Sequence, residues 1–226
     1  MTTSQAGRVA VVVGANRGIG LALCQQLKAR GRTVIAAART SSPALAGLGV
    51  RVEAGVEVTS DTSVADFARR LEGVRIDELV CSAGILREDT LDDLVFDQIR
   101  EQLEVNALGP LRVARTLVSQ LGAGSKIALI TSRMGSIGDN GSGGEYGYRM
   151  SKAALNAAGV SLARDLRASR IAVAILHPGY VRTDMTRGGG NLAPEESARM
   201  LVDRLDGLTL ETSGTFWHAN GQVLPW

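Results

Sequence analysis

The chain has few of the residues that build disulfide frameworks and metal sites. Its 226 residues include two cysteines, Cys24 and Cys81, and two histidines, His177 and His218. The cysteines have no CxxC spacing and no nearby histidine, and both lie in apolar segments, so we interpret them as reduced, buried thiols. Because these four residues form no cluster along the sequence, we predict that the protein has no metal site.

Long apolar runs and an excess of one charge are also lacking. No stretch of 18 apolar residues occurs, and residues 1–7 are polar, without the apolar region of a signal peptide. The formal net charge is +2 and the arginines are scattered, which is untypical of a nucleic-acid-binding surface. We therefore expect a cytoplasmic protein with no membrane segment and no nucleic-acid partner, and a flexible N-terminus at residues 1–7.

Aromatic residues are scarce, at 4% of the chain, whereas aliphatic residues are plentiful. This composition is typical of buried parallel strands that pack under helices. A chain of this length is most simply one domain, here residues 1–226, that buries roughly 70% of its unfolded surface.

Apolar, β-branched runs alternate with helical segments along the chain. Strands are expected at residues 8–13, 33–37, 50–58, 78–82, 126–131, 171–177 and 214–217. Helices are expected at 19–30, 62–71 with Asp61 as N-cap, 94–121, from the region of Tyr148 to 169, and 194–205. This alternation predicts an α/β fold: a single doubly wound Rossmann-type domain with a mostly parallel sheet of about seven strands and helices on both faces.

A glycine-rich turn joins the first predicted strand to the first predicted helix. Its sequence is Gly14-Ala15-Asn16-Arg17-Gly18-Ile19-Gly20. Glycine lets the backbone approach a pyrophosphate, while free N–H groups and the helix dipole attract the anion. Tight turns between strand and helix need glycine in any case, but in this context we predict that the turn binds a dinucleotide, through all of these residues except Ala15.

The end of the second predicted strand indicates which dinucleotide is bound. An acidic residue there would accept a hydrogen bond from a ribose 2′-hydroxyl and repel a 2′-phosphate, but the sequence is Ala38-Arg39-Thr40-Ser41. Arg39, with Arg17 and the hydroxyls of Thr40 and Ser41, could form a phosphate clamp. The alternative is that both arginines are simply solvated. The missing acid favours NADP(H) over NAD(H).

Tyr148 and Lys152 are four residues apart on a predicted helix and share one face, about 6 Å apart at Cβ. An ammonium at that distance favours the phenolate, which makes the phenol a readier proton donor or acceptor near neutral pH. Ser132, which ends a predicted buried strand, could place a hydroxyl beside the same oxygen. A Tyr-x-x-x-Lys spacing is common by itself, so the neighbouring motifs decide its meaning.

With the glycine-rich turn, Ser132, Tyr148 and Lys152 in this order, the chain resembles the short-chain dehydrogenase/reductase (SDR) family over essentially its whole length. The segments 130–136 and 146–156 look like those of the C-factor and sniffer-type carbonyl reductases. The resemblance implies that Tyr148 is the general acid/base and that Ser132 hydrogen-bonds the substrate oxygen. It also implies that Lys152 holds the nicotinamide ribose hydroxyls and lowers the pKa of Tyr148.

Two further motifs gain a role only through this resemblance. Asn106, in Glu104-Val105-Asn106-Ala107, matches the asparagine that holds a water in a proton relay to Lys152. Without the match, it would be a helical asparagine that bonds its own backbone. The loop Pro178-Gly179-Tyr180-Val181-Arg182-Thr183 matches the loop that orients the nicotinamide carboxamide, which implies cofactor contacts at Pro178, Gly179, Val181 and Thr183; otherwise Pro178-Gly179 is simply a turn.

The chain departs from the family pattern in three places. Cys81-Ser82-Ala83-Gly84 stands where the family has Asn-Asn-Ala-Gly, and Glu57 with Val58 stands where it has Asp-Val. The resemblance still implies that Glu57, Val58, Ser82, Ala83 and Gly84 contact the cofactor. The segment between Ser132 and Tyr148 is a few residues longer than usual, which indicates a reshaped wall of the substrate pocket. The other wall residues would be Arg133, Met134, Ile137, Tyr180 and residues 185–192.

The function predicted from these residues is an NADP(H)-dependent oxidoreductase. It would transfer hydride between the nicotinamide and a small carbonyl or secondary alcohol substrate. A non-catalytic, dinucleotide-binding regulatory or signalling protein is the alternative, which the intact Ser, Tyr, Lys and Asn set disfavours because a sensor needs no acid. A nucleotide-sugar epimerase is disfavoured because only about 40 residues follow Thr183, fewer than its C-terminal substrate domain needs.

Small residues recur along the helix that follows Lys152. They are Ala153, Ala154, Ala157, Ala158, Gly159 and Ser161. These are too many for one sheet-facing stripe, and on an outer face they would let a partner helix pack closely. Because the equivalent helix commonly forms a two-fold interface in the resembled family, we expect a homodimer or homotetramer; otherwise the alanines are only good helix formers on a solvated face.

Overall fold

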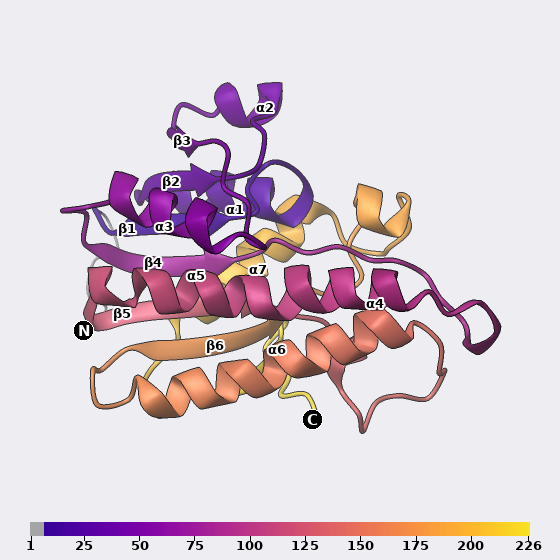
Figure 1. Ribbon diagram of the computed structural model, residues 1–226. Helices are drawn as coiled ribbons and strands as arrows, with labels where there is room; N and C mark the ends of the chain where they lie inside the picture. Colours follow the sequence, from indigo (N-terminus) through magenta and orange to yellow (C-terminus); the bar gives the residue numbers. More distant parts are fainter. Residues whose placement is uncertain (1–6) are drawn as a thin grey trace.

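The computed structural model of the protein describes residues 7–226 and is built around one seven-stranded sheet (Figure 1). The strand order is β3-β2-β1-β4-β5-β6-β7, and all six neighbouring pairs are parallel. The predicted α/β fold is therefore confirmed. Of the predicted flexible N-terminus, residues 1–6 lie outside the described residues.

The strands and helices follow one another as the alternation of the sequence predicts. The strands are β1 (Val9–Val13), β2 (Thr33–Ala37), β3 (Arg51–Glu53), β4 (Ile76–Cys81), β5 (Leu121–Ile130), β6 (Ala172–His177) and β7 (Phe216–His218). The α-helices are α1 (Gly18–Ala29), α2 (Pro43–Ala46), α3 (Asp61–Arg70), α4 (Phe96–Leu103), α5 (Gly109–Leu117), α6 (Tyr146–Asp165) and α7 (Pro194–Asp206). Short 3-10 turns include η4 (Arg133–Gly135) and η5 (Asp184–Thr186), and η2 (Glu104–Leu108) is a π-helical turn.

Helices cover both faces of the sheet, as Figure 1 shows. Val12 of β1 faces a core that includes side chains of α1 and α7, whereas Val11 and Val13 face a second core with side chains of α3, α5 and α6. Because successive side chains of a strand point to opposite faces, both faces must be apolar when both are covered. This explains the uninterrupted apolar runs of the sequence. Cys24 and Cys81 are free and buried in these cores, as predicted.

Some element boundaries differ from those predicted. Ser60, not Asp61, caps α3, because the Ser60 hydroxyl accepts a hydrogen bond from the Ser63 N–H at 3.2 Å and Asp61 is already helical. The third strand spans only Arg51–Glu53, since Gly55 adopts a φ of +75° that turns the chain out of the extended conformation. The helix predicted over 94–121 is divided by the π-helical turn η2.

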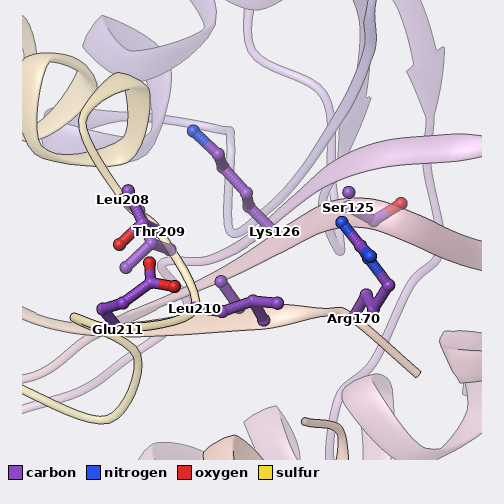
Figure 2. Close-up of a pocket in the computed structure, with 9 residues that line it drawn as sticks. Ser125, Lys126, Arg170, Leu208, Thr209, Leu210 and Glu211 are labelled. Carbon is purple, nitrogen blue, oxygen red and sulfur yellow. The ribbon is translucent and has the colours of Figure 1, made fainter. Parts of the chain in front are cut away.

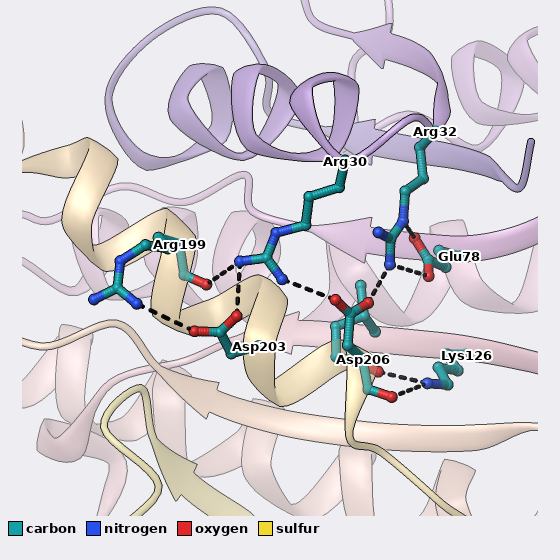
Figure 3. A network of polar contacts seen from close by, with 8 residues as sticks. Arg30, Arg32, Glu78, Lys126, Arg199, Asp203 and Asp206 are labelled. Carbon is teal, nitrogen blue, oxygen red and sulfur yellow. Dashed lines mark hydrogen bonds and ion pairs between the residues drawn. The ribbon is translucent and has the colours of Figure 1, made fainter. Parts of the chain in front are cut away.

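Charged side chains gather at the N-terminal ends of the strands (Figure 3). The Arg32 guanidinium donates to both carboxylate oxygens of Glu78, each at 3.2 Å, and both side chains are almost fully buried. Asp206, at the end of α7, pairs with both Arg32 and Arg30. The Lys126 ammonium donates to two main-chain carbonyls at the end of α7, at 2.6 and 2.8 Å. This network joins β2, β4 and β5 to α7 on the edge of the sheet opposite the glycine-rich turn.

Candidate active site at the carboxyl ends of the strands

The glycine-rich turn leaves β1 and packs directly against the loop that follows β4. Gly14 has a φ of +90°, and a Cβ on it would lie 2.4 Å from the main-chain nitrogen of Ala83. A Cβ on Gly20 would lie 2.0 Å from the Gly14 carbonyl oxygen. Side chains at these two positions would push the turn away from the sheet, so glycine is required at both.

The turn offers unpaired polar groups that suit a dinucleotide. No side chain caps the N-terminus of α1, and its first turn has no acidic residue, so the N–H groups of residues 18–20 and the positive helix end face outward. The Asn16 Oδ1 atom is buried and has no hydrogen-bond partner within residues 7–226. A bound pyrophosphate and a nearby hydroxyl donor would satisfy these groups, so the residues present fit such a ligand.

The two arginines expected to clamp a 2′-phosphate lie in separate ion pairs. Arg17 pairs with Asp184 at 2.8 Å, and Arg39 lies 3.6 Å from a carboxylate oxygen of Glu57. Both arginine side chains are more than 70% exposed, and Thr40 is also exposed. The structure therefore does not bring Arg17 and Arg39 together, although both remain free to change partners because exposed ion pairs are weak.

Asn106 fastens the loop that follows β4 to α6. Its Oδ1 accepts from the Ile85 N–H at 2.8 Å, and its Nδ2 donates to the Ile85 carbonyl at 2.8 Å and to the Ser151 hydroxyl at 3.0 Å. The side chain thus bonds another segment rather than its own helix. A Cβ on Gly84 would lie 3.2 Å from Asn106 Oδ1 and 3.6 Å from Lys152 Nζ, so the amide and the ammonium both lie close to this glycine.

Tyr148 and Lys152 lie on α6 and are both buried, with 8% and 4% of their surface exposed. The Lys152 Nζ atom lies 5.7 Å from the centre of the Tyr148 ring and donates to the Ile130 carbonyl at 3.0 Å. Burial lowers the pKa of Lys152 to about 8. Burial also raises the pKa of Tyr148 to about 12, against a smaller lowering by the Ser132 hydroxyl. The net shift of the Tyr148 pKa is therefore upward, opposite to the direction expected from Lys152.

The segment after β5 is packed tightly on α6, which places Ser132 next to Tyr148. A Cβ on Gly135 would lie 2.7 Å from the main-chain carbon of Lys152, so only glycine allows this contact. Asn156 of α6 accepts from the Thr131 hydroxyl at 2.7 Å and donates to the Gly135 carbonyl at 3.3 Å. The Ser132 hydroxyl accepts from the Met134 N–H at 3.2 Å, which fixes the start of η4.

The start of α6 is held by a residue that the sequence did not reveal. The Asp89 carboxylate, although 57 residues away, accepts from the N–H groups of Tyr146 at 2.5 Å and Gly147 at 3.1 Å. The residue before the helix, Glu145, adopts a left-handed φ of 52°, and one of its carboxylate oxygens is buried without a partner in the described part of the chain. Neither residue belongs to a local pattern, so no signal in the sequence could have identified them.

The loop after β6 closes the site from the other side. Gly179 has a φ of +89°, and a Cβ there would lie 2.5 Å from the Leu192 side chain. Val181 is buried and forms a bridge with Leu192, and Pro178 is held because its carbonyl accepts from the Ser197 hydroxyl at 2.7 Å. A Cβ on Gly18 would lie 3.4 Å from the Thr183 methyl group, so this loop faces the glycine-rich turn.

A hollow of about 280 Å³ lies elsewhere, near the start of β5 and β6 (Figure 2). It is lined by Gly124, Ser125, Lys126, Arg170, Ala172 and residues 208–211. The Lys126 ammonium is already satisfied by carbonyls of α7. In α/β sheets, ligands bind beyond the carboxyl ends of the strands, and this hollow lies at the opposite ends, so we assign the functional site to the residues around Tyr148.

The described residues contain neither a metal-binding cluster nor a membrane-spanning helix. Within residues 7–226 no three His, Cys, Asp or Glu side chains gather in a way that could hold a metal ion. In the same part of the chain, no helix combines the length and apolar character that spanning a membrane requires.

A comparison with protein families matches residues 8–191 to the short chain dehydrogenase family. The chain belongs to this family. It is 44% identical over 222 residues to 1-hydroxy-2-glutathionyl-2-methyl-3-butene dehydrogenase of Rhodococcus sp. (strain AD45), covering 96% of this chain and 98% of the relative. It is 41% identical over 154 residues to C-signal of Myxococcus xanthus, covering 67% of this chain and 93% of that protein.

Among solved structures, the NADPH-bound carbonyl reductase from chicken fatty liver has the same fold. The TM-score is 0.88 at 30% sequence identity, and the match covers 98% of this chain and 100% of the other. The predicted resemblance to the SDR family, including C-factor and carbonyl reductases, is thus confirmed. This short-chain dehydrogenase is accordingly an oxidoreductase by family.

Proposed function

We propose that this short-chain dehydrogenase is an NADP(H)-dependent oxidoreductase that interconverts a carbonyl compound and its alcohol, with Tyr148 as the general acid/base. The observation that carries the proposal is the placement of Ser132, Tyr148 and Lys152. All three side chains are buried. Tyr148 and Lys152 lie on α6, and Ser132, which follows β5, is within hydrogen-bond reach of Tyr148. A phenol, a hydroxyl and an ammonium converge where a reacting carbonyl oxygen would need proton donors.

The cofactor would be held by two groups of residues that face each other. On one side are Gly14, Asn16, Arg17, Gly18, Ile19 and Gly20 of the turn, together with Arg39, Thr40, Glu57, Val58, Ser82, Ala83 and Gly84. On the other side are Pro178, Gly179, Val181 and Thr183, together with Tyr148 and Lys152. When bound, the nicotinamide supplies or accepts the hydride. The unpaired Asn16 oxygen and the uncapped start of α1 support this assignment.

The choice of NADP(H) rests on the end of β2. The segment Ala38-Arg39-Thr40 carries no acidic side chain to accept from a ribose 2′-hydroxyl, and Arg39 is exposed there. A 2′-phosphate would replace the loose contact of Arg39 with Glu57 by a charge-assisted hydrogen bond. The NADPH-bound state of the chicken carbonyl reductase, which shares the fold, supports the same choice.

The proton chemistry belongs to Tyr148. Because burial keeps its pKa near 12, the phenol is protonated at neutral pH and can donate to the oxygen of a carbonyl that is being reduced. The Ser132 hydroxyl can donate to the same oxygen and stabilise its developing negative charge. Lys152 remains largely protonated below its pKa of about 8, so its ammonium can stabilise the tyrosinate left behind and hold ribose hydroxyls.

The name of the Rhodococcus relative supports a substrate with a polar substituent beside the alcohol. That relative is a dehydrogenase for 1-hydroxy-2-glutathionyl-2-methyl-3-butene. The wall predicted for the pocket of this chain has both apolar and charged members, because Ile137 and Tyr180 are exposed apolar side chains and Arg133 is half exposed. We therefore propose that the substrates include alcohols and carbonyl compounds that carry a thioether-linked peptide, as the glutathionyl group of the relative's substrate is.

The test is a turnover assay on the purified protein. NADPH oxidation would be followed with ketones, quinones and aldehydes, and NADP⁺ reduction with alcohols that include the glutathionyl butenol. We expect turnover of at least one of these compounds, faster with NADP(H) than with NAD(H). Binding of NADPH without turnover of any compound would overturn the proposal and favour a dinucleotide-binding regulatory protein.

A further inference from the structure

Arg133 directly follows Ser132, and it is held in a way that leaves most of its donors free. Its Nε atom donates to the Asp139 carboxylate at 2.8 Å. Its two terminal nitrogens have no hydrogen-bond partner among residues 7–226, and 52% of the side chain is exposed. Asp139 therefore fixes the plane of the guanidinium. The edge formed by the two terminal nitrogens stays available, and it could donate two parallel hydrogen bonds to a carboxylate.

The segment that carries Arg133 and Asp139 is fixed at several points. The Asp139 N–H donates to the Ser136 hydroxyl at 3.1 Å, and the Gly138 N–H donates to the Trp226 carbonyl at 2.7 Å. The close contact of Gly135 with α6 anchors the beginning of the segment. An arginine held on such a support loses little conformational entropy when it binds an anion, because its position is already set.

Two histidines lie within range of the charge of this arginine. His177 ends β6 and His218 ends β7, the two residues are paired in register, and their ring centres are 5.0 Å apart. Burial is the main cause that lowers the pKa of both rings, and the positive charge of Arg133 lowers both further. The charge of Arg133 therefore reaches both imidazoles, and Asp139 is the carboxylate that faces Arg133 on its own segment.

The hydrogen bonds of these rings indicate where their protons lie. His218 Nδ1 accepts from the Asn220 N–H at 3.0 Å, so the proton of the neutral ring is on Nε2. That atom lies 3.7 Å from the position of a Cβ on Gly179, in the loop that faces the glycine-rich turn. His177 Nδ1 is buried with no partner in the part of the chain that the structure describes. The carboxyl ends of β5, β6 and β7 thus bring a cation, an N–H donor and, within the described residues, an imidazole nitrogen without a partner to the same edge of the sheet.

We propose that Arg133, together with His218 at the end of β7, forms a carboxylate-binding subsite in the substrate pocket, so that the enzyme prefers carbonyl or alcohol substrates that carry a carboxylate. The inference rests on the proposed function, because it assigns a substrate class to the same site. A carboxylate suits the free edge of Arg133 better than a phosphate does, since a dianion would also lie close to Asp139. An arginine that served only to hold its segment would need no more than the bond from Nε.

The first experiment compares matched acids and esters. A series of oxohexanoates and their methyl esters would be reduced with NADPH by the wild type, Arg133→Gln, Arg133→Lys and Arg69→Gln. Arg69 is the control, because it is an exposed arginine paired with an aspartate, Asp66, on α3. The wild type should prefer the best acid over its ester by about 10- to 150-fold in kcat/KM, as a charge-assisted bond allows.

The variants separate recognition from a structural role. In Arg133→Gln the acid-to-ester ratio should fall close to one, mainly through a higher KM for the acid, and Arg133→Lys should keep part of the preference. Arg69→Gln should keep the ratio of the wild type. Equal use of acid and ester by the wild type, or an equal loss for both in Arg133→Gln, would overturn the inference while leaving the proposed function standing.

A second measurement does not depend on turnover. The imidazole resonances of His177 and His218 would be followed by NMR during titration with the oxohexanoates, with His218→Gln used for assignment. When the acid is added to the wild type, we expect saturable shifts of these resonances. We expect no shifts when the methyl ester is added to the wild type or when the acid is added to Arg133→Gln. Shifts without turnover of any substrate would contradict the proposed function alone, and the absence of shifts would overturn the subsite.

Discussion

Tyr148 and Lys152 are buried, and within residues 7–226 neither side chain forms an ion pair. Burial favours the neutral form of each group: it raises the pKa of the Tyr148 phenol to about 12 and lowers the pKa of the Lys152 ammonium to about 8. Groups that are expensive to bury are retained in proteins mainly where their chemistry is used. Burying the pair therefore costs folding stability, which fits the catalytic roles that we propose for both residues.

Tyr148→Phe removes the proton donor and keeps the ring. We expect turnover to fall by roughly 10²–10⁴, the usual contribution of a positioned general acid, while NADPH binding is retained. The measurement is kcat with the best carbonyl substrate, together with a fluorescence titration of NADPH. Turnover near that of the wild type would refute the role assigned to Tyr148.

Lys152→Met tests the cost of burying the ammonium. Between pH 8 and 10.5 the unfolded chain holds a proton that the folded protein has released, so the stability of the wild type rises with pH in this window. Methionine removes the buried charge, and we expect the cofactor-free variant to be more stable at pH 7 by about 1–3 kcal/mol. The gain should shrink as the pH rises through this window. Urea unfolding across pH measures it, and a less stable variant at pH 7 would contradict the prediction.

Arg39→Ala tests the choice of cofactor. If Arg39 bonds a 2′-phosphate, the substitution should weaken NADPH binding by roughly 10- to 150-fold and leave NADH binding nearly unchanged. Calorimetric titration of both cofactors into the wild type and the variant gives the ratio, with Arg69→Ala as the control for loss of an exposed arginine. Equal or tighter NADH binding by the wild type would show that the choice of NADP(H) is wrong.

At the scale of single residues, the sequence predicts what is local. The spacing of Tyr148 and Lys152 and the glycines of the first turn are visible because helix and turn geometry bring near neighbours together. The pairing of Arg17 with Asp184, 167 residues apart, and the capping of α6 by Asp89 depend on how segments meet in the folded chain. No periodicity encodes such contacts, so only the structure could show them.

For strands and helices, the sequence predicts the regular elements but not the local irregularities in the backbone. Runs such as residues 9–13 and 33–37 predict buried strands well because both faces of the sheet are covered. A third strand was predicted at 50–58, but its early end at Glu53 was not, and neither was the π-helical turn η2. Each depends on local backbone geometry: the positive φ of Gly55 in one case and the insertion of Asn106 toward the β4 loop in the other. The π-helical turn also carries Asn106, one of the proposed site residues.

Glu78→Gln tests the network that joins β2, β4 and α7 in Figure 3. The substitution leaves the buried Arg32 guanidinium without its buried carboxylate, with only the partly exposed Asp206 as an anionic partner, and we expect a loss of about 3–5 kcal/mol in the free energy of unfolding. The double variant Arg32→Met with Glu78→Met should recover most of this loss, because no buried charge then lacks a partner. Urea unfolding measures both. A single variant as stable as the wild type would show that Asp206 alone satisfies Arg32.

For the whole molecule, the outer side of α6 raises the question of assembly. Ala157 and Ser161 are exposed on this helix, Met150 is 51% exposed on it, and Leu108 in η2 is 47% exposed. Figure 1 shows α5 and α6 on the same side of the sheet, and the two helices are in contact. Small side chains let a partner helix approach closely, and the exposed apolar residues would be covered by it.

We therefore expect a homodimer or homotetramer, with α6 at the interface. Light scattering at micromolar concentration should give two or four times the monomer mass. Ala157→Arg places a long cation where the partner helix would pack, so it should lower the mass to that of the monomer, whereas Ala44→Arg, at an exposed alanine of α2, should not. A monomeric wild type would instead mean that the alanines of α6 serve as helix formers on a solvated face.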